Sequence, residues 1–116
     1  MDLEDIIGKH IEWKIKFRRA LDNKERLDVN KIMQDDSCSV GKWLYSEGDK
    51  YARFPSYMTL IKKHAEFHKH AAQVALEANA GNVGVVDRML APGSPYNSAF
   101  SEISIAVRKL MKEAGL

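Results

Sequence analysis

The sequence predicts an all-α protein, an antiparallel helical bundle similar to a four-helix bundle, with a short extra helix that carries the only cysteine. Two observations lead to this prediction. Hydrophobic residues recur at steps of three and four along three long segments, and the period of two that marks strands is not sustained. Glycine, proline and short Asp/Ser clusters separate these segments and supply helix ends.

The composition suits one soluble domain that spans residues 1–116. With 45% hydrophobic and 29% charged residues, the chain can bury a single core. Its 18 basic and 16 acidic residues are interspersed, which is not typical of a nucleic-acid-binding surface. No apolar run approaches the ~20 residues of a membrane span, and the acidic start of the chain is unlike a signal peptide. These features favour a cytoplasmic protein.

The first predicted helix covers residues 3–21. Its apolar stripe consists of Leu3, Ile6, Ile7, His10, Trp13, Phe17 and Leu21. A histidine on such a stripe, here His10, is either a core residue bonded to a carbonyl or a ligand. Ile11 and Ile15 extend the apolar character beside the stripe, which is a weak indication of a dimer interface.

A break at 22–25 and a connecting segment at 27–33, with at most one helical turn, lead to Cys38. Asp and Ser residues before Val40 are N-cap candidates and Gly48 is a C-terminal stop, so we predict a short helix over 39–46 and a loop over 49–55. Cys38 lies at the mouth of this helix, where backbone N–H groups and the helix dipole stabilise a thiolate. One cysteine cannot form an internal disulfide, so Cys38 is a ligand, a reactive thiolate or an inert buried thiol.

The longest predicted helix covers residues 56–80, with Pro55 in its first turn and Gly81 at its end. His64 and His68 are four residues apart and can bind one ion from the same face. They could instead be two surface histidines among lysines, but both fall on the core-facing stripe, where buried imidazoles need partners.

Two neighbours of this pair carry weaker signals. His70 points to the opposite side of the helix, so we expect it in solvent. Glu66 does not stand where the His-Glu-x-x-His motif of zinc proteases places its general base, which argues against a protease.

The remainder of the chain predicts two more helices. A less regular one covers 82–90, a loop with two prolines covers 91–95, and a final helix covers 96–113. The stripe of that last helix consists of Phe100, Ile103, Val107 and Leu110.

Three motifs in order resemble the chemoreceptor zinc-binding (CZB) domain of bacteria over nearly the whole chain. They are His10 with Trp13, a Cys-x-x-Gly-x-Trp-Leu motif at 38–44, and a His-x-x-Phe-His motif at 64–68. The resemblance implies one Zn²⁺ bound by three histidines and one cysteine. These ligands carry over to His10, Cys38, His64 and His68, and His70 has no counterpart among them.

The resemblance also implies a homodimer that signals, as in chemotaxis, through an attached chemoreceptor module or a diguanylate cyclase. This chain contains neither module, and we expect a stand-alone member rather than a piece of a longer protein.

Four protein ligands leave no open coordination position, so the site is expected to be regulatory or structural and the protein not an enzyme. Two alternatives stay open beside zinc sensing. Oxidation of zinc-bound Cys38, for example by hypochlorous acid, would make the domain a redox sensor. A hemerythrin-like di-iron or oxygen-binding bundle is less favoured, because it needs further histidine and carboxylate ligands that this chain lacks.

Overall fold

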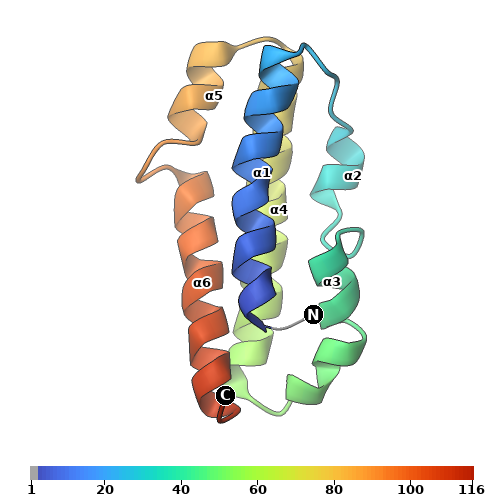
Figure 1. Cartoon of the computed structure of the whole chain (residues 1–116), viewed down its shortest axis with the longest axis vertical. Helices are drawn as coiled ribbons and strands as arrows, with labels where there is room; N and C mark the ends of the chain where they lie inside the picture. Colours follow the sequence, from blue (N-terminus) through green and yellow to red (C-terminus); the bar gives the residue numbers. More distant parts are fainter. Residues whose placement is uncertain (1–2) are drawn as a thin grey trace.

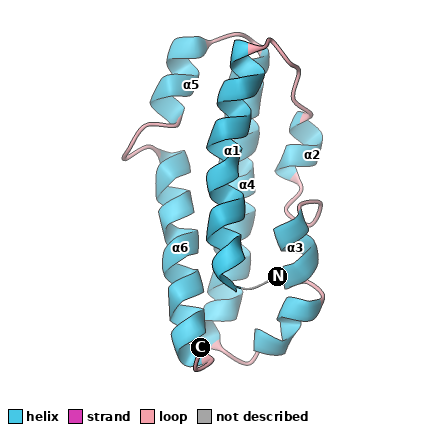
Figure 2. Cartoon of the chain, viewed as in Figure 1, coloured by secondary structure: helices cyan, strands magenta, loops and turns pink. Residues whose placement is uncertain are grey.

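The computed structural model describes residues 3–116, so the first two residues of the expected domain lie outside it. Within that range every regular element is a helix, as Figures 1 and 2 show. The elements are α1 (Leu3–Asp22), α2 (Val29–Met33), α3 (Ser39–Leu44), the 3₁₀ helix η1 (Glu47–Tyr51), α4 (Pro55–Asn79), α5 (Val83–Met89) and α6 (Pro95–Glu113). The predicted all-α fold is confirmed.

The chain runs along the long axis of the molecule four times in alternating directions, and the molecule measures 44 × 26 × 18 Å. In Figure 1, α1 runs upward, α2, α3 and η1 descend beside it, α4 runs upward again, and α5 and α6 descend. The second of these passes consists of α2, α3 and η1, and the fourth consists of α5 and α6. We call α1, α4 and α6 the body, and residues 23–54, which contain α2, α3 and η1, the strap.

Aromatic rings fill the centre of the body. The ring of Tyr96 lies 5.0 Å from that of Phe67 and 6.1 Å from that of Phe17, between centroids. The predicted stripes account for most of the core, because their members on all three long helices are largely buried. Ile11 and Ile15 are the exception that the sequence anticipated: they are 51% and 57% exposed on the outer face of α1.

The ends of the long helices follow the predicted signals to within one residue. Pro55 opens α4, and Gly81 follows it with a φ of +75°, a conformation that glycine adopts at little cost. At the start of α6, the Ser94 hydroxyl accepts a hydrogen bond from the backbone N–H of Asn97, and Pro95 occupies the first turn.

The predicted end of the cysteine helix is wrong. The helix α3 ends at Leu44, and the 3₁₀ helix η1 covers Gly48 and the first residues of the expected loop. Gly48 has a different role. A Cβ there would lie 3.1 Å from ring atoms of Trp43, so the glycine allows that indole to pack against the backbone instead of stopping a helix.

Specific hydrogen bonds tie the strap to α4 near both of its ends. The side-chain amide of Asn79 accepts from the Leu27 N–H at 2.8 Å and donates to the Leu27 carbonyl at 2.9 Å. Farther along, the Tyr57 hydroxyl donates to the carbonyl of Leu44 at 2.6 Å. The strap is therefore positioned largely by the helix that carries two of the predicted ligands.

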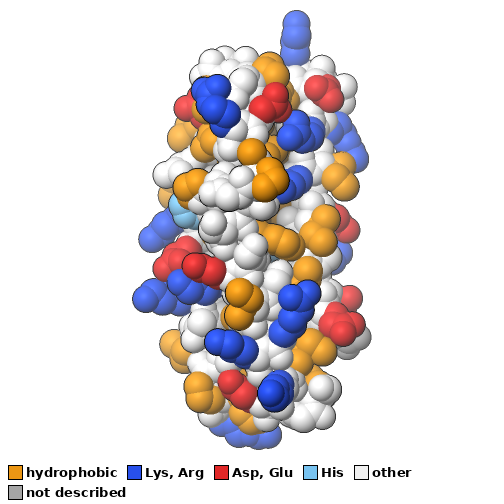
Figure 3. Space-filling model, turned by 90° about the vertical axis from the view of Figure 1, so that its left-hand side faces the viewer, with side chains coloured by type: hydrophobic (Ala, Val, Ile, Leu, Met, Phe, Trp, Pro, Cys, Tyr) orange, Lys and Arg blue, Asp and Glu red, His pale blue; other side chains and the backbone are white. Residues whose placement is uncertain are grey.

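The outer surface carries charges of both signs. Figure 3 shows the face on the side of α5 and α6, where basic and acidic side chains are intermixed and hydrophobic ones are scattered. In the part of the chain that the structure describes, no helix has the length and hydrophobicity needed to cross a membrane.

Candidate metal centre

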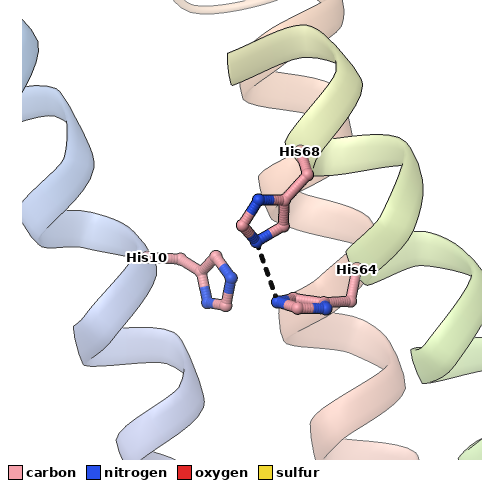
Figure 4. Close-up of side chains that lie close together, drawn as sticks. All are labelled: His10, His64 and His68. Atoms are coloured by element: carbon pink, nitrogen blue, oxygen red, sulfur yellow. Dashed lines mark hydrogen bonds between the residues drawn. The ribbon is translucent and has the colours of Figure 1, made fainter. Parts of the chain in front are cut away.

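Three histidines converge in the interior of the bundle. Figure 4 shows the ring of His10 on α1 facing those of His64 and His68 on α4. One ring nitrogen from each lies within 4.8 Å of the others, and each residue is at most 1% exposed. A turn of helix separates His64 from His68, so both rings point to the same side of α4.

The cysteine of the strap reaches the same place. Its Sγ lies 3.4 Å from Nε2 of His64 and 3.4 Å from Nε2 of His68, and these two nitrogens are 3.2 Å apart. The three atoms thus form a triangle with nearly equal sides. His10 adjoins this triangle, with its ring centroid 5.0 Å from that of His64. All four sequence-predicted residues meet here. The mutually close group, whose ligand atoms all lie within 4.8 Å of one another, consists of the three histidines. Cys38 contacts two of them, His64 and His68.

The Cys-x-x-Gly-x-Trp-Leu motif explains how Cys38 is held. Cys38 is the N-cap of α3, and its sulfur accepts a hydrogen bond from the backbone N–H of Gly41 at 3.2 Å. A Cβ at Gly41 would lie 1.7 Å from the carbonyl oxygen of Asp35, so this turn can close only around glycine. Trp43 and Leu44 are buried and fix α3 in the core.

Two backbone carbonyls determine which ring nitrogen carries the proton in His10 and in His68. Nδ1 of His10 lies 2.7 Å from the carbonyl of Ile6, and Nδ1 of His68 lies 2.7 Å from the carbonyl of Ile32. A carbonyl can only accept, so each Nδ1 must donate. The Nε2 atoms of the two neutral rings therefore keep their lone pairs, which is the form that binds metals.

Burial keeps these rings neutral. Loss of solvation lowers the pKa of His10 to about 4, and burial with the neighbouring histidines lowers the pKa of His64 to about 2. Burial also lowers the pKa of His68. Each ring is thus available as a neutral ligand at physiological pH.

The sequence predicted that the N-terminus of the short helix stabilises the thiolate of Cys38, and this prediction is wrong. Burial raises the pKa of its thiol, and this effect outweighs the hydrogen bond from the Gly41 N–H that favours the thiolate. The α3 N-terminus alone is therefore too weak to ionise the sulfur. A nearby cation would be needed to do so.

These features have a match among known families. The family model described as the chemoreceptor zinc-binding domain matches residues 10–75, more than half of the 116. The chain belongs to this family. The matched segment runs from His10 through the strap to the last turns of α4, so it contains all the residues of the cluster. No curated protein and no solved structure matches the chain.

The donor set of this CZB domain fits zinc. Usual Zn–N and Zn–S bond lengths give a tetrahedron with N–N edges of about 3.3 Å and N–S edges of about 3.6 Å. The separations of 3.2 Å and 3.4 Å in the cluster are close to these values. In addition, Nε2 of His10 is buried without a hydrogen-bond partner among the described residues, as expected for a ligand atom. Nδ1 of His64 is also unpartnered, and the structure offers no explanation for it.

The two neighbouring residues lie outside the cluster. His70 is half-buried on α4 rather than fully in solvent, and it is absent from the mutually close group. Glu66 forms a salt bridge with Lys63 at 3.5 Å.

The backbone carbonyls that accept hydrogen bonds from His10 and His68 were not predicted from the sequence. The Ile6 carbonyl could have been found, because it stands four residues before His10 on a helix. The Ile32 carbonyl could not, because it lies 36 residues from His68.

Proposed function

We propose that residues 1–116 form a single regulatory zinc-binding domain, whose one site uses His10, Cys38, His64 and His68 as a closed His₃Cys ligand set. The observation that carries the proposal is the triangle of Cys38 Sγ with the Nε2 atoms of His64 and His68, whose sides match those of a zinc tetrahedron. The unpartnered Nε2 of His10 supplies the fourth donor. Membership of the CZB family supports zinc as the metal.

A bound zinc ion would supply the positive charge that the buried thiol needs to ionise. Four protein ligands would then leave no position for a water or a substrate, which argues for regulation and not catalysis. His10 belongs to α1, Cys38 to the strap, and the other two ligands to α4. Metal binding would therefore link these three parts of the chain directly, in addition to the core packing and the hydrogen bonds that already join them.

The proposed signal is a change in the strap. Without metal, Cys38 would be a neutral thiol held by the Gly41 N–H, by a weak bond to the Asp35 carbonyl at 3.5 Å and by long contacts of 3.4 Å to the Nε2 atoms of His64 and His68. The strap could then leave α4 more easily, and the change in bundle geometry would pass to a second copy in a homodimer, or to a chemoreceptor or diguanylate cyclase module in the cytoplasm.

Metal analysis of purified variants tests the site. The wild-type protein should contain one zinc per chain, and His10→Ala, Cys38→Ser, His64→Ala and His68→Ala should each lose it or bind it far more weakly. His70→Ala is the matched control, because it removes a histidine from the same helix outside the cluster. Circular dichroism should show that the variants remain helical. Wild-type zinc affinity in Cys38→Ser would exclude the proposed coordination.

A second function, redox sensing, is favoured by the position of Cys38. Its side chain is half-buried and lines a groove at the surface, so an oxidant could reach it. Hypochlorous acid would oxidise the thiolate by two electrons, giving sulfenic acid and chloride. Treatment of the zinc-loaded protein should then release zinc in step with sulfenic acid formation at Cys38, measured by mass spectrometry. Release without modification of Cys38 would contradict this function.

A further inference from the structure

A groove of about 570 Å³ leads from the surface to the proposed zinc site. It lies between α1 and the strap, and its lining includes His10, Cys38 and His68. His64 is not part of the lining, so the cluster is open towards this groove on one side and closed by α4 on the other. Among the four proposed ligands, Cys38 is half-buried and the three histidines are buried. An incoming molecule would therefore meet the sulfur first.

The walls of the groove are rich in basic side chains. They include Lys9, Lys16, Arg19, Arg26 and Lys31, against three acidic residues, Glu12, Glu25 and Asp28. The salt bridges found among the described residues lie elsewhere, at Arg18 and at Lys63.

Both walls contribute to this positive charge. Asp28 is already used locally, because its carboxylate accepts the N–H of Lys31 at the start of α2. On the α1 wall, the ammonium of Lys16 lies 4.9 Å from the ring centroid of Trp13. The groove therefore attracts small anions to the entrance of the site.

We infer that this groove binds small anionic chelators that carry several carboxylates, and that zinc enters and leaves the domain through the complex formed there. The inference rests on the proposed function. In the exchange, a carboxylate oxygen donates an electron pair to zinc as the bond from zinc to Cys38 Sγ breaks. The sulfur would keep its electron pair and take up the proton that the chelator releases as its remaining donor groups bind zinc, and the histidine Nε2 atoms would be displaced in turn. No oxidant or reductant is needed.

The test compares a charged and an uncharged chelator on the Co²⁺-substituted protein, whose thiolate-to-cobalt absorption reports the metal directly. With EDTA, a tetracarboxylate, the rate of metal loss should rise and then saturate with concentration, and it should fall when sodium chloride is added. With TPEN, an uncharged pyridyl chelator, the rate should not saturate in this way and should be insensitive to salt. Equal salt dependence for both chelators would overturn the inference.

Charge-reversal variants locate the binding site. Lys16→Glu with Arg19→Glu, both exposed on α1, should slow EDTA-dependent loss by about tenfold or more. Arg26→Glu with Lys31→Glu should do the same from the opposite wall. Arg108→Glu with Lys109→Glu is the matched control, because it makes the same charge change at exposed positions of α6 outside the groove. Equal effects of groove and control pairs, or no effect of either groove pair, would contradict the inference.

Failure of the proposed zinc site would look different. In that case the wild-type protein would show no thiolate-to-cobalt absorption at the outset, before any chelator is added. A normal absorption band followed by chelator-independent release would instead leave the site in place and exclude the groove as its entrance.

Discussion

The body and the strap are held in place by different kinds of interaction. In α4, eleven of 25 residues are buried, and eight of these are hydrophobic. In the 32 residues of the strap only six are buried, and two of these are glycines. Four hydrophobic strap residues do reach the core, and they are Ile32, Val40, Trp43 and Leu44. The strap also depends on particular contacts: those of Leu27 with Asn79 and of Ile32 with His68, and the position of Cys38 beside the histidines.

This difference is what the proposed metal response requires of the fold. Burial of apolar surface stabilises the body whether or not a metal is present. The strap gains part of its stability from a few polar groups, and one of them is a proposed ligand. Under the proposed function, removal of the zinc ion should therefore change the strap without unfolding the molecule.

The largest expected effect comes from breaking the body. Phe67 is fully buried, and its ring lies 4.8 Å from that of His10 and 5.0 Å from that of Tyr96, between centroids. Phe67→Ala should lower the free energy of unfolding by about 3–5 kcal/mol, because it removes apolar contacts and leaves a cavity. Chemical denaturation of the metal-free protein measures this loss. A loss below about 1 kcal/mol would show that the body is less tightly packed than described.

The pH dependence of the metal-free protein should reveal the cost of charging the cluster. The folded pKa of His10 is lowered from 6.5 to about 4, so the unfolded chain binds a proton more readily. Stability should therefore be fully present above pH 6.5 and fall as the pH decreases towards 4. His10 alone should contribute about 3 kcal/mol to this loss. Denaturation at several pH values measures the slope, and His10→Gln should reduce it; an unchanged slope would contradict the assignment.

Gly41→Ala should damage the strap while sparing the body. The new methyl group would collide with the Asp35 carbonyl, so the turn that presents Cys38 must open. We expect zinc affinity to fall on the order of 10–100-fold, and metal-free stability to fall by about 1–2 kcal/mol.

Gly8→Ala is the control for this substitution. Nothing lies within 4 Å of a Cβ at that position of α1, and alanine is the better helix former there. Calorimetric titration with zinc separates the two variants. Equal affinities would show that the Gly41 turn does not position the sulfur.

The smallest expected effect concerns the attachment of the strap to α4. Asn79→Ala removes both hydrogen bonds to Leu27 and should cost about 1 kcal/mol. Amide hydrogen exchange should become faster in the strap and stay unchanged in α6. Asn82→Ala is the control, because its side chain bonds only the exposed carboxylate of Glu77. Faster exchange throughout the chain would mean that the strap and body unfold together.

The sequence by itself determined the fold class, the three long helices and most of their buried faces. These features depend on residues close along the chain: the stripe that contains Phe67, and end signals such as Pro55, Gly81 and Ser94. Motif spacing also singled out His10, Cys38, His64 and His68 as one set, and it indicated the family that the comparison then established.

Only the tertiary structure decided how those four residues meet. The proton on His68 depends on the Ile32 carbonyl, which reaches it because the strap folds back along α4. The raised pKa of Cys38 depends on burial, and the role of Gly48 depends on where the Trp43 ring packs. Each of these outcomes is set by the path of the whole chain and by the solvent that it excludes. None of them can be read from local residue spacing.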